Sequence, residues 1–218
     1  MARFGIRSPV VFGISVPVLR SMARGLGRDH PLAQGLWATR VFEARLLAAM
    51  IDDPRAVTPA QREAWAEDFD NWAICDTCCG ELFRKTAGVD RVIRRWSRRP
   101  EEFVKRAAFA LIADLAVHDR DLPDARFRTY LEIVERSSDD ERIYVRKAVN
   151  WALRQVGKRN PTLWTAAIRS ARRIGQRESR AARWIASDAL RELTSPSVRR
   201  RVGLKRNGRG SAGGSPRH

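Results

Sequence analysis

A tryptophan and an aspartate four positions apart are the first residues in this sequence whose types and spacing could do chemistry. Trp72 and Asp76 fall in a segment that we expect to be helical, so they share one face of the helix. A carboxylate can stabilise positive charge or position water, and an aromatic ring attracts cations. The alternative interpretation is that Trp72 belongs to the core and Asp76 pairs with a neighbouring arginine.

A second tryptophan lies at the edge of another predicted apolar stripe. Trp151 follows Ala148 by three positions and is flanked by the basic residues Lys147 and Arg154. A half-exposed ring in such surroundings suits contact with a base or a sugar. The alternative is again a buried tryptophan in the core.

Three clustered cysteines, Cys75, Cys78 and Cys79, invite comparison with a metal site. Structural zinc usually needs four ligands in two spaced pairs, and here there is no second cysteine pair and the histidines are scattered. An odd, clustered set is not a disulfide framework either, which fits a reducing compartment. We therefore expect no metal and no cofactor.

Positive charge dominates the composition and is unevenly distributed. The chain has 42 Lys and Arg against 25 Asp and Glu, for a net charge of +17. Residues 1–70 are nearly balanced, with nine arginines against eight acids, whereas residues 165–218 hold 14 basic and three acidic residues. Such a field attracts polyanions, and arginine favours bidentate contact with phosphate. Nucleic acid is the expected partner.

Membrane insertion is not expected. No run approaches the roughly 20 apolar residues that a membrane helix needs. Arginines and prolines interrupt the apolar residues of 1–19, so we read no signal peptide there. We expect a cytoplasmic protein associated with the nucleoid.

Helical periodicity broken by Pro, Gly and Asp extends along the chain, and no strand pattern stands out. The expected helices occupy residues 17–27, 31–51, 59–69, 72–85, 89–96, 101–118, 124–136, 143–157, 162–174 and 180–193. Pairs of them recur about every 35–40 residues, a spacing typical of HEAT repeats. The sequence predicts an all-α, right-handed solenoid over residues 1–204 and a disordered basic Gly/Ser/Arg tail over 205–218.

Two of the predicted helices begin alike. Residues 103–107 and 144–148 both read aromatic, valine, basic, basic, alanine. Stacked helices of this kind would line a concave groove with cations and with positive helix N-termini. The groove cations expected to bind DNA are Lys105, Arg106, Arg146, Lys147, Arg154, Lys158 and Arg183.

Several of these segments together resemble the AlkD-like DNA alkylation repair family. The resemblance rests mainly on residues 71–76, 103–108 and 146–154, with support from 12–20 and 184–190, and it covers about residues 4–202. It implies a HEAT-like solenoid that removes N3- or N7-alkylated purines from duplex DNA without a cofactor.

The resemblance also implies roles for particular residues. Trp72 and Trp151 would be the aromatic pair around the damaged nucleotide, and Asp76 would be the catalytic carboxylate. Arg106, or the adjacent Lys105, would grip the DNA backbone. We expect a monomer with no obligate protein partner. The main rival is a non-catalytic HEAT-repeat binder of damaged, distorted or branched DNA, and a weaker rival is a protein scaffold.

Overall fold

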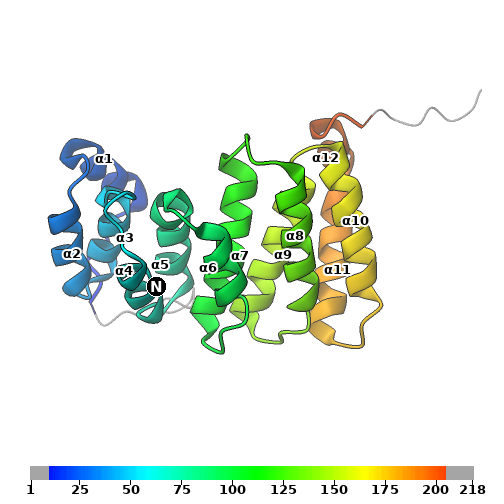
Figure 1. Cartoon of the computed structure of the whole chain (residues 1–218), viewed down its shortest axis with the longest axis horizontal. Coiled ribbons are helices and arrows are strands. Elements are labelled where there is room, and N and C mark those ends of the chain that lie inside the picture. The colour runs from blue at the N-terminus through cyan, green and yellow to red at the C-terminus, as the bar shows by residue number, and fades with distance from the viewer. Residues whose placement is uncertain (1–9, 205–218) are drawn as a thin grey trace, which may run out of the picture.

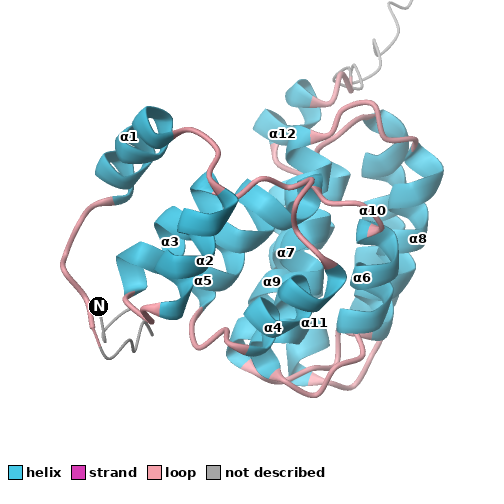
Figure 2. Cartoon of the chain, turned by 60° about the vertical axis from the view of Figure 1, so that its left-hand side comes forward, coloured by secondary structure: helices cyan, strands magenta, loops and turns pink. Residues whose placement is uncertain are grey.

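The computed structural model describes residues 10–204, and every regular element within that range is a helix (Figure 2). The α-helices are α1 (Val16–Leu26), α2 (His30–Ala38), α3 (Phe42–Ile51), α4 (Pro59–Glu67), α5 (Trp72–Thr77), α6 (Val89–Trp96), α7 (Glu102–His118), α8 (Asp124–Arg136), α9 (Ile143–Gly157), α10 (Pro161–Gly175), α11 (Arg180–Leu193) and α12 (Pro196–Arg201). None of the helices in this range is long and apolar enough to cross a membrane. The predicted tail, residues 205–218, lies outside the described residues.

The helices form two rows that run along the long axis of the molecule (Figure 1). In the odd-numbered row, α3 packs on α5, α5 on α7, α7 on α9 and α9 on α11. The even-numbered row covers it, with α6 on α7, α8 on α9 and α10 on α11. This arrangement confirms the predicted all-α architecture of stacked helix pairs.

Local sequence signals explain where many of the helices begin. Thr58 caps α4 by accepting a hydrogen bond from the Gln61 amide, with Pro59 at the first helical position. Asn160 caps α10 in the same way, and Ser179 caps α11. These starts agree with the sequence predictions to within one residue.

Two of the predicted helices are wrong. Residues 72–85 form α5, a π-helical segment (Cys78–Leu82) and a short 3-10 helix (Phe83–Lys85) instead of one α-helix. Residues 31–51 form two helices, α2 and α3, instead of one. The break lies at Thr39–Val41, where Arg40 adopts a left-handed backbone with φ of 58°. An L-residue rarely takes this conformation, which usually marks a glycine. Because the sequence has an arginine and no glycine at this position, nothing in it signals the turn. Helix α12 is also absent from the sequence prediction.

An aromatic cluster joins the first helices to the centre of the molecule. The rings of Trp37 and Trp65 stack with centroids 4.0 Å apart and planes 3° apart. Phe69 and Phe83 continue the cluster, and Phe83 meets Trp96 edge-on at 6.0 Å. This packing holds α2, α4 and α6 beside the segment that carries Asp76.

Candidate functional site

The start of α5 fixes the relation between Trp72 and Asp76. Asn71 is buried, and its side-chain oxygen accepts hydrogen bonds from the amides of Ala73 and Ile74, each 3.0 Å long. This cap makes Trp72 the first residue of the helix, and Asp76 follows one turn later on the same face. The shared face predicted from the spacing is therefore present.

Asp76 forms a bidentate ion pair with Arg106 of α7. Arg106 Nε donates to Asp76 Oδ1 at 2.9 Å, and Arg106 Nη2 donates to Oδ2 at 2.7 Å. Arg106 Nη1 donates to the Tyr144 carbonyl oxygen of α9 at 2.7 Å. The pair joins three successive helices of the odd-numbered row. Pairing with an arginine is the alternative interpretation of Asp76 from the sequence, and the structure shows such a pair.

Burial and charge act against each other at this pair. The Asp76 side chain is 21% exposed and that of Arg106 is 8% exposed. Burial raises the pKa of Asp76, and the charge and hydrogen bonds of Arg106 counter only part of that rise, so the pKa stays above its ordinary value. Burial works against the charge of Arg106 too, but Asp76 outweighs it and the pKa of Arg106 is raised. Arg106 thus favours the ionised, oriented form of the carboxylate.

Both candidate tryptophans are partly buried and pack against the core. Trp72 begins α5, one turn before Asp76. Trp151 lies seven residues after Tyr144 on α9, about two turns along the same face. Both residues are therefore partly accessible, and both lie on helices that the Asp76–Arg106 pair connects.

The other cations predicted to bind DNA differ in whether they are exposed or already paired within the chain. Lys147 is exposed on α9, and Arg146 lies over the ring of Trp184 at 5.2 Å from its centroid. Lys105 pairs with Asp140 at 2.9 Å. Part of the expected charge in this row is therefore neutralised within the molecule.

Two of the other predicted cations, Arg154 and Lys158, pair with acidic residues of α11. Lys158 pairs with Glu192 at 2.7 Å, and Arg154 pairs with both Glu192 and Asp188. Arg183, at the start of α11, donates to the Glu178 carbonyl oxygen at 2.6 Å. Arg154 and Lys158 would have to exchange these carboxylates for phosphates in order to bind DNA.

The three clustered cysteines are all buried and make contacts that a structural role explains. Cys75 Sγ donates to the Phe103 carbonyl oxygen at 3.4 Å, and Cys79 Sγ donates to that of Ala107 at 3.6 Å. Burial raises the pKa values of the Cys78 and Cys79 thiols. Within residues 10–204, His, Cys, Asp and Glu side chains form no cluster that could hold a metal ion.

Sequence reasoning missed one buried acid beside the pair. Asp114 lies on α7, about two turns after Arg106, and its Oδ2 has no hydrogen-bond partner in the described part of the chain. Burial raises its pKa to about 7, and the nearby charge of Asp76 adds to the effect. A Cβ atom on Gly80 would lie 3.2 Å from Asp114 Oδ2. The sequence feature that could have indicated this buried acid is a single aspartate within an otherwise apolar run of residues.

Gly80 belongs to a π-helical segment, Cys78–Leu82, which continues directly from α5. Such segments are rare and occur frequently at functional sites. Here the missing side chain at Gly80 lets the backbone approach Asp114. The irregular segment therefore positions a buried carboxyl group close to Asp76.

The chain shares its fold with a solved helical-repeat structure and its sequence pattern with a known family. A solved structure with a TM-score of 0.72 is 20% identical and aligns over 94% of this chain and 88% of its own; it is described as "A new family of proteins related to the HEAT-like repeat DNA glycosylases with affinity for branched DNA structures". That likeness places the fold among HEAT-like helical-repeat proteins. The family described as "DNA alkylation repair enzyme" matches residues 1–193, and the chain belongs to that family. No curated protein sequence matches.

Proposed function

We propose that this protein excises cationic N3- or N7-alkylated purines from duplex DNA. The observation that carries the proposal is the Asp76 carboxylate, which Arg106 holds by two hydrogen bonds one turn from Trp72. An oriented carboxylate next to an aromatic ring suits a positively charged nucleotide. Family membership supports the same reaction class.

The proposed reaction is hydrolysis of the N-glycosidic bond. Alkylation at N3 or N7 makes the purine cationic, so the bonding electron pair leaves with the base and neutralises it. The sugar then carries oxocarbenium charge, which the negative charge of Asp76 stabilises. Water adds to the sugar carbon C1′, and its proton passes to Asp76 or to solvent. Trp72 and Trp151 contact the nucleotide through their accessible faces.

Arg106 has two proposed tasks that compete for the same nitrogens. As found here, it positions Asp76 and bridges to Tyr144. The backbone grip predicted for Arg106 would require it to leave at least one of these partners for a phosphate. Lys105 would have to leave Asp140 for the same purpose. The phosphate contact stays a prediction, and positioning of Asp76 is the task that the contacts support.

The proposed substrate is double-stranded DNA with an alkylated base, bound by a monomer in the cytoplasm. Lys147 is exposed at the start of α9 and Arg183 at the start of α11, where both side chains can reach phosphates. Arg146, Arg154 and Lys158 would add contacts. Their binding should be salt-sensitive, because each phosphate contact releases a counterion.

A second candidate function is binding of branched DNA without catalysis. One observation favours it: the structurally similar protein is described as having affinity for branched DNA structures. In this alternative the Asp76–Arg106 pair is a structural bridge between α5, α7 and α9. The two functions differ in whether a free base is released.

The experiment that separates them is incubation of the purified protein with methylated duplex DNA, followed by chromatography of the released bases. Excision predicts free 7-methylguanine or 3-methyladenine in amounts that increase with enzyme concentration. If DNA binds but neither base is released, the glycosylase proposal is overturned and the binding function stands.

A further inference from the structure

Helix α6 carries an unusually dense row of arginines on the face that points away from α7. Its buried side consists of Val89, Val92, Ile93 and Trp96. The opposite side and the turn that follows line a shallow hollow with five arginines, namely Arg91, Arg94, Arg95, Arg98 and Arg99. Because α6 belongs to the even-numbered row, this surface differs from the one that carries Asp76.

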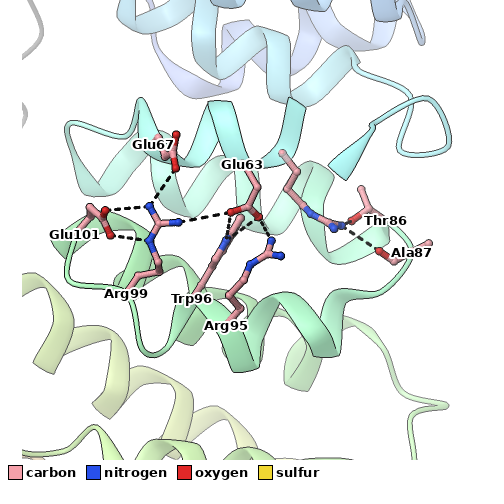
Figure 3. A network of polar contacts seen from close by, with 9 residues as sticks. Glu63, Glu67, Thr86, Ala87, Arg95, Trp96, Arg99 and Glu101 are labelled. Carbon is pink, nitrogen blue, oxygen red and sulfur yellow. Dashed lines mark hydrogen bonds and ion pairs between the residues drawn. The ribbon is translucent and has the colours of Figure 1, made fainter. Parts of the chain in front are cut away.

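Carboxylates from neighbouring segments neutralise two of the five arginines (Figure 3). Glu63 of α4 pairs with Arg95 and accepts the Trp96 indole N–H at 2.9 Å. Arg99 pairs with Glu67 at 3.1 Å and with Glu101 at 2.8 Å. These contacts hold α6 and the turn after it against α4, and they engage the carboxylates of Glu63, Glu67 and Glu101.

Arg91, Arg94 and Arg98 are left exposed, without an ion-pair or hydrogen-bond partner for their side chains among residues 10–204. The acid within α6, Asp90, is already engaged by Arg126 and Tyr130 of α8. Like charges three or four residues apart on a helix repel one another and destabilise it. Repulsion among these arginines therefore destabilises the folded protein when no partner is bound, and an anionic partner would reduce that repulsion.

We propose that Arg91, Arg94 and Arg98 bind the phosphate backbone of a second DNA segment, separate from the segment beside Asp76. From Arg91 on α6 to Arg98 in the turn after it the chain advances seven residues, about two helical turns, which is comparable with the spacing of about three phosphates of one DNA strand. Arginine presents planar donors suited to phosphate. A branched DNA supplies two segments to one protein, so this surface would favour branched over linear DNA.

An anionic membrane is the weaker occupant for this surface. A membrane-surface helix needs an apolar face to insert beside its cations. The apolar face of α6 is buried against its neighbours, and none of the exposed large hydrophobic residues of the described chain lies on this helix. Charge without insertion favours a nucleic-acid backbone.

The test is a binding titration at several salt concentrations with a three-way DNA junction and with a linear duplex of equal strand length. The variant is the triple substitution Arg91→Gln, Arg94→Gln and Arg98→Gln. The matched control removes three other exposed arginines of the even-numbered row, through Arg128→Gln, Arg169→Gln and Arg172→Gln. Circular dichroism checks that both variants are folded.

The proposal predicts that the α6 variant binds the junction on the order of 10- to 100-fold more weakly, with a salt slope lower by about 2.7. Its affinity for linear duplex, and any base release from that duplex, should change less than about threefold. Equal weakening by the control variant, equal weakening on linear duplex, or unchanged junction binding would overturn it. Failure of base excision by the wild type leaves this test unaffected.

Discussion

The carboxylate at the centre of the proposed site is held by its partners and does not lie free in solvent. Arg106 uses both Nε and Nη2 on Asp76 and donates its remaining terminal nitrogen to Tyr144. A group bound in this way has little freedom to reorient, so its charge is in place before a substrate arrives. That preorganisation is useful for stabilising a short-lived positive charge on the sugar.

Asp114 gives a pH-dependent test of the buried surroundings of Asp76. Its pKa is raised from 3.8 to about 7 by burial and by Asp76, so the folded protein keeps a proton there that the unfolded chain loses. Unfolding releases that proton between about pH 4 and 7, and stability therefore falls as the pH rises through this window. The Asp114→Asn substitution should remove this contribution, which lowers the free energy of unfolding by up to about 4 kcal/mol as the pH rises.

Urea unfolding at pH 5 and pH 8 measures this effect. Relative to the wild type, the Asp114→Asn variant should become more stable at pH 8 than at pH 5. Asp121→Asn, which changes an exposed carboxylate in the loop before α8, serves as the control and should leave the wild-type pH dependence intact. The same pH dependence in Asp114→Asn and wild type would contradict the burial argument.

At the scale of the elements, glycine allows the last helix pairs to pack closely. A Cβ atom on Gly157, at the end of α9, would lie 2.8 Å from Leu193 Cδ2 and 2.9 Å from the Ala167 Cβ. Gly157→Ala should push α10 and α11 away from α9 and destabilise the protein by about 1–3 kcal/mol. A Cβ atom on Gly25 in α1 would have no atom of residues 10–204 within 4 Å, apart from its chain neighbours and the backbone of its own helix.

Gly25→Ala is therefore the matched control for this packing prediction. It should stabilise the protein by about 0.5–1 kcal/mol, because alanine restricts the unfolded chain and favours the helix. Thermal or urea unfolding of the two variants should give changes of opposite sign. A stabilising Gly157→Ala would show that the junction of α9, α10 and α11 is looser than these distances indicate.

Much of the helical layout follows from local signals, whereas the contacts between helices do not. Proline and cap residues mark the starts of α4 and α10, but nothing in the sequence announces the left-handed Arg40 that separates α2 from α3. The common face of Trp72 and Asp76 follows from helical spacing. The partner of Asp76 lies 30 residues away on another helix, so only the packing of α5 on α7 selects Arg106.

At the scale of the whole molecule, the net charge of +17 is divided between paired and unpaired cations. Lys105, Arg154 and Lys158 are already paired with acids of the same chain. Three exposed arginines without such partners, Arg91, Arg94 and Arg98, lie close together on α6 and the turn that follows it, in the even-numbered row. The net charge alone predicted only that the protein binds a polyanion. The folded structure shows which surfaces carry cations that are not already paired and could therefore bind it.

The proposed role of Asp76 is tested by the single-turnover rate of 7-methylguanine release by the wild type and by Asp76→Asn, with DNA binding measured on the same duplex. We expect the variant to be about 10²–10³-fold slower while it still binds the duplex. Equal rates for the two proteins would contradict the assignment of Asp76 as the residue that stabilises the developing charge.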